Sequence, residues 1–277
     1  MTTMTRPKRT LIGIDLFRQL ARQGDRVFTT ERARELAPLV GLKESYLVEA
    51  LYHLDRNGWI VRLRRGLYAL SSTTPGVSDA HEYEIAMSLV SPAAISHMTA
   101  LHHHGLTEQI PRTIFVLTTT EATVPRVRKS GQDSRRDDYE VGGTTYKFVQ
   151  VRPHLFFGAE RIWVADARVW VTDLERTLLD GLSMPRHFGG VAEVLHGFDV
   201  AMERLDVERI ADYACRMNTS TAKRLGRVLE SHGIDDPVVD RLASLPVKGW
   251  RKLDSSGPKK GRYNRRWMLI ENPLKES

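Results

Sequence analysis

Four histidines lie close together in the segment SHMTALHHHG, and histidine is a common ligand of zinc. They are His97, His102, His103 and His104. Adjacent histidines on a helix point about 100° apart, so these side chains cannot all face one ion. Neither an HExxH motif nor a carboxylate at ligand spacing accompanies them. We therefore predict no metal site here, and expect histidines at a helix carboxyl end, where positive charge interacts favourably with the dipole.

A second set of candidate catalytic residues is acidic. Asp173, Glu175 and Asp180 lie in TDLERTLLD, and clustered carboxylates can hold the metal ions of a nuclease. No lysine follows them, Thr172 or Asp173 suits a helix N-cap, and leucines at helical spacing predict a buried stripe. Glycine-rich segments match neither a phosphate-binding loop nor a dinucleotide fingerprint. We predict a protein that is not an enzyme and needs no cofactor; a nuclease would require these carboxylates to gather around a metal.

Basic residues offer a different chemistry, the binding of phosphates. In WIVRLRRGLYAL, Val61 and Leu63 alternate with Arg62 and Arg64, and Arg65 precedes Gly66. This alternation predicts a β-hairpin with one buried face and one face of guanidinium groups. A charged, solvated edge strand is the alternative interpretation of the same pattern.

The C-terminal stretch WRKLDSSGPKKGRYNRRWMLIENP is also basic. Its candidate binding residues are Lys259, Lys260, Arg262, Arg265 and Arg266, which are interleaved with Gly257, Gly261, Tyr263 and Trp267. Basic and aromatic residues in alternation are typical of nucleic-acid-binding loops. We expect a second basic surface feeding a strand from Trp267 to Ile270; a solvated loop and a site for an acidic protein remain alternatives.

Three predicted helices precede the hairpin and would position its arginines. They run from Asp15 to Gln23, from about Thr30 to Leu36, and through LKESYLVEALYHLDRNG. Three short helices followed by a hairpin are the order of a winged helix-turn-helix, whose third helix enters the DNA major groove. The predicted DNA-binding residues are Lys43, Ser45 and Tyr46 at the start of that helix, and Arg62, Arg64 and Arg65 on the wing.

Charge is concentrated at the two ends of the sequence. Residues 1–71 carry a net charge of +6, residues 72–240 carry −6 and residues 241–277 carry +7. A phosphate-binding surface is expected to concentrate charge in this way, because releasing counterions supplies much of its affinity. The run RPKR, from Arg6 to Arg9, is either a DNA-binding arm or a solubilising terminus.

The rest of the chain predicts a second, mixed domain. After a linker, SSTTPGVS, two helices are followed by strands at Thr113–Thr119 and Thr144–Val151, a hairpin turning near Ala165, and a run of helices from Asp173 onward. The predicted fold is α+β, with a winged helix-turn-helix at residues 1–71 and a mixed domain with a small sheet and several helices at residues 72–277. Neither a membrane-spanning run nor a signal peptide is found, so we expect a cytoplasmic protein.

Several segments together resemble the AbiEi family, the antitoxins of type IV toxin-antitoxin systems. They are RRGLYAL, SHMTALHHHGLTEQIP, FFG, DLERTLLD, RLGRVLE and PKKGRYNRRWMLIEN, in this order along nearly the whole chain. The resemblance implies a winged helix that represses its own operon by binding inverted repeats in the promoter. It also implies a second domain that counters a nucleotidyltransferase-like toxin without requiring a stable complex with it.

The partners expected on this basis are double-stranded DNA and the cognate toxin. The alternative function is a ligand-responsive winged-helix transcriptional regulator, whose second domain would bind a metabolite in a mixed polar pocket.

Overall fold

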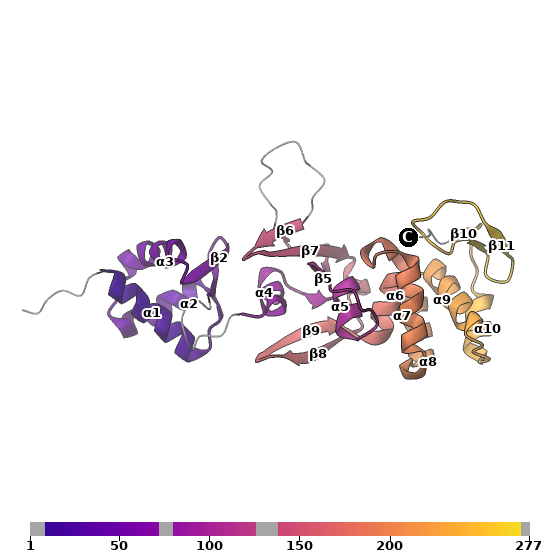
Figure 1. The fold of residues 1–277 in the computed structure, drawn as a ribbon, viewed down its shortest axis with the longest axis horizontal. Helices are drawn as coiled ribbons and strands as arrows, with labels where there is room; N and C mark the ends of the chain where they lie inside the picture. Colours follow the sequence, from indigo (N-terminus) through magenta and orange to yellow (C-terminus); the bar gives the residue numbers. More distant parts are fainter. Residues whose placement is uncertain (1–8, 72–79, 126–137, 273–277) are drawn as a thin grey trace, which may run out of the picture. The chain divides into compact units, whose positions relative to one another are not determined.

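The chain divides into two compact units, and the computed structural model describes residues 9–71, 80–125 and 138–272 of it (Figure 1). Among these, residues 9–71, 80–91, 123–125, 138–145 and 163–168 belong to one unit, and residues 92–122, 146–162 and 169–272 to the other. The fold class is α+β, as predicted. Along the described ranges, no helix has both the length and the apolar character needed to cross a membrane.

Some predicted segments fall outside the described residues. These are the linker after Ser71 and residues 6–8 of the basic arm. The predicted boundary between domains at residue 71 stays a prediction.

The N-terminal part contains three helices and a small sheet. Its elements are α1 (Arg9–Gln23), β1 (Val27–Thr29), α2 (Thr30–Leu36), α3 (Leu47–Arg56), β2 (Ile60–Arg64) and β3 (Leu67–Leu70). The three strands form an antiparallel sheet in the order β1-β3-β2. The strand β1 is too short to have been recognised from the sequence, because three residues carry no periodicity.

Local sequence explains where these helices begin and which side they bury. The Thr29 side chain caps α2 by accepting a hydrogen bond from the Arg32 backbone N–H at 3.2 Å. In α3 the predicted stripe is buried, with Leu47, Leu51 and Leu54 all in the core of the N-terminal part. Each buried leucine contributes about 2 kcal/mol relative to an exposed one.

A six-stranded sheet follows, in the order β6-β7-β5-β4-β9-β8. Its strands are β4 (Ala94–Ile95), β5 (Thr113–Thr119), β6 (Asp138–Val141), β7 (Thr144–Val151), β8 (Ala159–Val164) and β9 (Ala167–Thr172). The predicted strands Thr113–Thr119 and Thr144–Val151 are confirmed, and so is the hairpin that turns near Ala165. β4 pairs antiparallel with β5 and parallel with β9.

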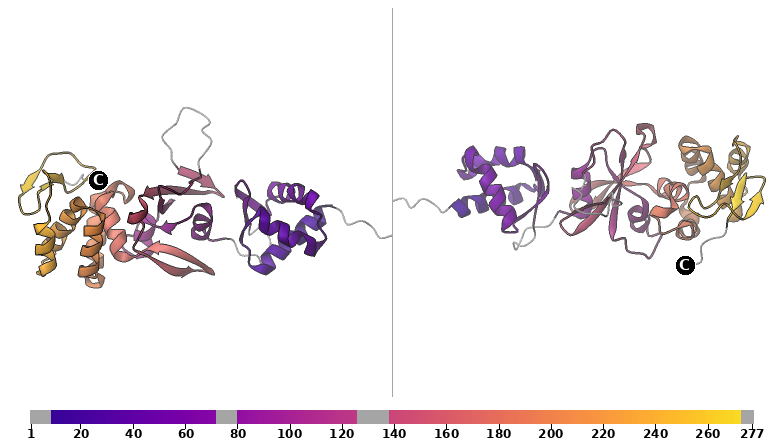
Figure 2. Two further views of the ribbon diagram at one scale, coloured as in Figure 1. Left: turned by 180° about the vertical axis from the view of Figure 1, so that it is seen from behind. Right: turned by 90° about the horizontal axis from the view of Figure 1, so that it is seen from above.

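The helices around and after this sheet are α4 (Glu82–Leu89), α5 (His97–His103), α6 (Leu174–Ser183), α7 (Val191–Ala201), α8 (Val207–Met217), α9 (Thr219–Ser231) and α10 (Pro237–Ser244). Three short strands end the described chain: β10 (Arg251–Lys252), β11 (Arg262–Asn264) and β12 (Leu269–Glu271). β12 lies between β10 and β11, parallel to the first and antiparallel to the second. In both views of Figure 2 the orange and yellow segments, from α7 to β12, lie together.

Aliphatic side chains from α5 to α10 build the large core of the second unit, and Trp267 belongs to it. The indole of Trp267 packs against Gly226 of α9, where any Cβ would overlap the ring. Its Nε1 donates a hydrogen bond to Glu230 Oε2 at 2.7 Å. A strand was predicted from Trp267 to Ile270; β12 instead begins at Leu269. Trp267 itself is a core residue, because the glycine in RLGRVLE leaves room for it.

Candidate nucleic-acid interface

The first predicted DNA-binding residues precede α3 and are not part of it. Lys43, Ser45 and Tyr46 are exposed, and the last two lie in a 3₁₀ turn, Glu44–Tyr46, that leads into the helix. The predicted continuous helix is therefore shorter, beginning at Leu47. Backbone N–H groups of such a helix start carry partial positive charge, which favours a phosphate nearby.

The exposed side of α3 is polar and aromatic. It carries Val48, Glu49, Tyr52, His53 and Arg56. Arg56 Nη1 donates a hydrogen bond to the Tyr52 hydroxyl at 3.0 Å, and His53 Nε2 lies 3.8 Å from Glu49 Oε1. These side chains offer donors, an aromatic ring and one apolar group, the kinds of group that contact base edges in a major groove.

The hairpin β2–β3 presents its arginines without using them to hold the fold. Arg62, Arg64 and Arg65 are exposed, and within the described residues their side chains make no hydrogen bond or ion pair. Gly66 forms the turn with a φ of +76°, a conformation that disfavours residues with a Cβ. Three unpaired guanidinium groups are therefore available for phosphates.

The pairing of β2 with β3 departs from the alternation of buried and exposed residues that the sequence predicted. Arg62 pairs with Tyr68 and Arg64 with Leu67, so the ladder is irregular between the two arginines. Ile60 and Leu63 are fully buried, whereas Val61 is only partly so. The irregularity allows Leu63 to reach the core while its neighbours on both sides stay exposed.

One hydrogen bond ties the hairpin to α3. The Asp55 carboxylate, in the last turn of the helix, accepts from the Arg62 backbone N–H at 3.0 Å. Because this N–H belongs to β2, the contact fixes the arginine-bearing strand relative to the helix.

The C-terminal basic residues divide into two groups. Lys259, Lys260, Arg262 and Arg265 are exposed and have no side-chain hydrogen bond or ion pair in the described part of the chain. Arg266 is different, since it pairs with Glu230 at 3.1 Å and with Asp240 at 2.8 Å. Arg266 therefore helps to attach this segment to α9 and α10.

The four histidines occupy unlike surroundings. His97 is fully buried and its Nδ1 lies 2.8 Å from the Ser96 hydroxyl, whereas His104 Nε2 lies 2.7 Å from the Thr172 carbonyl oxygen. Burial, with the positive charges of Arg176 and Lys147 nearby, lowers the pKa of His97 to about 3. Across the described ranges, the side chains of His, Cys, Asp and Glu form no group of three that could hold a metal ion.

The three acidic residues of TDLERTLLD also point to separate partners. Asp173 caps α6 by accepting from the Arg176 backbone N–H at 2.8 Å, and its other oxygen accepts from the Tyr213 hydroxyl. Glu175 binds Arg209 and the Asp206 backbone N–H. Asp180 pairs with Arg176 at 3.0 Å. Their carboxylates are thus dispersed over three separate interactions.

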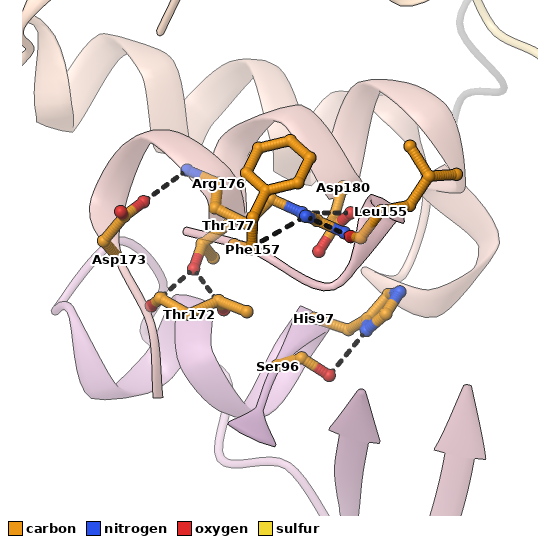
Figure 3. Close-up of polar contacts among 9 residues, drawn as sticks. All are labelled: Ser96, His97, Leu155, Phe157, Thr172, Asp173, Arg176, Thr177 and Asp180. Carbon is orange, nitrogen blue, oxygen red and sulfur yellow. Dashed lines mark hydrogen bonds and ion pairs between the residues drawn. The ribbon is translucent and has the colours of Figure 1, made fainter. Parts of the chain in front are cut away.

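Arg176 links two of the quoted motifs, as Figure 3 shows. Its Nη1 donates to the carbonyl oxygens of Leu155 at 2.8 Å and Phe157 at 2.9 Å, so DLERTLLD holds the FFG segment. Burial raises the pKa of the Asp180 carboxyl, an effect that the charge of Arg176 opposes. Such a pair is expected to fix geometry, because leaving one partner alone in the core is costly. Sequence reasoning did not find this role, although the unusual Arg and Asp within a leucine stripe were a signal of it.

The chain matches no family model. No curated protein matches it either. Among solved structures, it is similar to the crystal structure of the RV2827C protein from Mycobacterium tuberculosis, with a TM-score of 0.68 and 17% sequence identity. The alignment covers 95% of this chain and 92% of that one. At this identity, the similarity between the two proteins concerns their fold alone.

Proposed function

We propose that residues 9–71 form a winged helix-turn-helix that binds double-stranded DNA in the promoter of the protein's own operon. In this proposal α2 and α3 are the helix-turn-helix, and the β2–β3 hairpin is the wing. The observation that supports it is the β2–β3 hairpin, in which three exposed arginines without side-chain partners in the described residues follow a helix with a polar, aromatic face.

Each part would have a distinct role in the complex. The outer face of α3 would enter the major groove, with Lys43, Ser45 and Tyr46 near base edges or flanking phosphates. The wing arginines would bind backbone phosphates or an adjacent minor groove. The 13 cations and 7 carboxylate residues of positions 1–71 would supply the sequence-independent part of the affinity.

We further propose that the protein is a repressor and antitoxin of a type IV system, with no catalytic activity and no cofactor. The support for this is the resemblance of the quoted segments to the AbiEi family. The second unit would counter a nucleotidyltransferase-like toxin. Its motifs hold core contacts, such as those of Arg176 and Trp267, so we expect them to preserve the shape of the unit and not to perform chemistry.

A salt-titrated mobility-shift assay tests the first part. The protein's own upstream DNA is compared with an unrelated fragment of equal length. We expect tighter binding to the upstream DNA, by a factor of about 10³ or more, and a salt dependence equivalent to several phosphates. Equal, weak binding to both fragments would contradict a repressor of its own promoter.

The antitoxin role is tested by co-expression with the nucleotidyltransferase-like protein encoded next to it. Growth should be restored by the full chain and equally by a chain whose Arg64 and Arg65 are both replaced by alanine. Failure of the full chain to restore growth, with both proteins expressed, would refute the antitoxin role while leaving DNA binding untouched.

A further inference from the structure

The C-terminal sheet carries a second group of cations that the fold does not use. We define the C-terminal basic surface as Arg251, Lys259, Lys260, Arg262 and Arg265, together with the aromatic pair Trp250 and Tyr263. All five cations are exposed, and in the described chain none of their side chains makes a hydrogen bond or ion pair. Charges of one sign that remain unpaired at close quarters raise the local concentration of a polyanion.

Three of the four carboxylates around this surface are already paired with arginines. Glu230 and Asp240 pair with Arg266, and Glu271 pairs with Arg227 at 2.5 Å. Asp254 is buried and accepts a hydrogen bond from the Ser256 backbone N–H at 2.8 Å. Glu271 also lies opposite Arg262 in the β11–β12 pairing, so the charge of Arg262 is partly offset. The five exposed cations still outnumber Asp254 and Glu271, the two carboxylates of residues 250–272.

The loop that carries the lysines is held in shape. The Asn272 side chain exchanges two hydrogen bonds with the Asp254 backbone, at 2.9 and 3.0 Å, and Lys252 Nζ donates to the Gly257 carbonyl at 2.5 Å. A Cβ on Gly261 would overlap the Glu271 carbonyl, so only glycine allows β11 to approach β12 this closely. A solubilising loop would not need these contacts, whereas a binding surface gains affinity from a fixed geometry.

The sheet is also anchored to the helices behind it. Arg224 of α9 is buried, and donates to the carbonyl oxygens of Lys252 at 2.9 Å and Leu182 at 3.2 Å. With Trp267 in the core, both ends of the C-terminal segment are fixed. In the strand pairing Arg251 lies opposite Leu269 and Arg262 opposite Glu271, so these two arginines lie on one face of the sheet, whereas Tyr263, opposite Ile270, lies on the other. β11 is an edge strand of this sheet, so a ligand that follows the edge can meet Arg262 and Tyr263 from its two sides.

An aromatic ring on this surface is exposed as well. The side chain of Tyr263 is 55% exposed and meets Trp250 edge to face, with ring centroids 4.8 Å apart. The contact fixes the orientation of the tyrosine while leaving ring surface open. A base can stack on such a ring only if it is not already stacked within a duplex.

We propose that the C-terminal basic surface binds single-stranded nucleic acid, with the cations on phosphates and Tyr263 stacked on a base. An acidic protein would satisfy the cations, but it would give no use to an exposed, oriented aromatic ring on the same edge strand as Arg262. The proposal is independent of the operator binding assigned above to the N-terminal part.

The test is fluorescence anisotropy with the full chain and a labelled strand of about 12 nucleotides that cannot pair with itself, within the range that single-strand-binding folds cover. The strand is made as RNA and as DNA, and the duplex of the same sequence is measured beside them. The variant Lys259→Gln/Lys260→Gln/Arg262→Gln should weaken single-strand binding at least about tenfold and lower the slope of log affinity against log salt by about 2. Binding of the duplex through the N-terminal part should change less than twofold.

Two further variants test stacking. Tyr263→Ala should weaken single-strand binding about five- to hundredfold with an unchanged salt slope, whereas Tyr263→Phe should bind as the wild type does. Thermal unfolding of both variants should match the wild type, which separates lost stacking from lost structure.

A charge-matched control is Arg168→Gln/Arg204→Gln/Arg241→Gln, which removes three exposed cations elsewhere on the chain. The proposal fails if this control loses as much single-strand affinity, or if Tyr263→Ala has no effect. It also fails if poly-glutamate displaces the strand as well as an unlabelled strand of equal charge does, because the surface would then suit an acidic protein.

Discussion

The two basic ends of the chain differ in what the fold does with their charges. On the β2–β3 hairpin all three arginines are left exposed and without partners in the described residues. At the C-terminus one arginine, Arg266, forms ion pairs with residues of α9 and α10. The next residue, Trp267, is buried. The two ends have similar net charges, +6 for residues 1–71 and +7 for residues 241–277, but different arrangements: one is an exposed hairpin and the other is a sheet fixed to a helical core.

The two basic surfaces depend on different hydrophobic cores. The hairpin depends on a small core of the N-terminal part, whereas the C-terminal basic surface depends on the large core that contains Trp267. Damage to one core is expected to remove one surface and leave the other.

The largest effect should come from Trp267→Ala. Removing a fully buried indole is expected to lower the free energy of unfolding by about 3–5 kcal/mol, measured by urea denaturation. Trp170→Ala is the matched control, since Trp170 is 45% exposed and should cost less than about 1 kcal/mol. Operator binding should survive Trp267→Ala, and its loss would show that the two surfaces are not separable.

Acid should destabilise the second unit through His97. The pKa of this buried imidazole is lowered to about 3, so the folded state holds it neutral while the unfolded state takes up a proton below about 6.5. Its contribution to stability is complete above pH 6.5 and is lost as the pH falls from there toward 3. By pH 4.5 the loss is roughly 3 kcal/mol.

Denaturation curves of the wild type and His97→Phe at pH 7 and pH 4.5 measure this. The variant should lose less stability on acidification, whereas the control His154→Phe, at an exposed position, should lose as much as the wild type. Equal acid sensitivity of His97→Phe and the wild type would show that another group controls the acid transition.

A smaller effect is expected on the hairpin. Arg64→Ala should weaken binding to every duplex by a similar factor, about five- to tenfold, and reduce the salt slope by about 0.9, because a phosphate contact is lost. Arg204→Ala, which removes an exposed cation elsewhere, should leave both quantities unchanged. Loss of affinity for the operator alone, with the slope unchanged, would mean that Arg64 contacts bases.

The smallest effect is expected from replacing Arg266, which forms ion pairs, and it is compared with replacing its neighbour Arg265, which forms none in the described chain. Arg266→Gln should lower stability by less than about 1 kcal/mol, since its ion pairs are partly exposed, and should not change single-strand binding. Arg265→Gln should do the reverse, with unchanged stability and weaker binding. Equal binding losses in both variants would show that ion pairing does not remove Arg266 from the surface.

Regular elements with clear periodicity could be predicted from the sequence. The strands at Thr113–Thr119 and Thr144–Val151 and the stripe of α3 follow from alternation and from helical spacing, which are local properties. β4, with two residues, and β1, with three, could not be found in this way. They exist because partner strands complete their hydrogen bonds.

The candidate sites were predicted less completely, and for a different reason. Exposed arginines in a hairpin can be anticipated from alternation, but the burial of Trp267 depends on a glycine about forty residues earlier in the chain. The pairing of Arg176 with Asp180 could be guessed from their i, i+4 spacing, whereas its hold on the Leu155 and Phe157 carbonyls could not. Contacts between distant segments carry no local pattern.

The hydrogen bond from the Arg62 backbone N–H to Asp55 gives the proposed DNA complex a fixed spacing. Helix and hairpin cannot shift independently, so the distance along the duplex between the base pairs that α3 reads and the phosphates that the wing holds is set by the protein. Inserting one base pair between them would move the phosphates by about 3.4 Å along the axis, and the fold has no means of following. Operators of this protein should therefore tolerate changes of base more readily than changes of length.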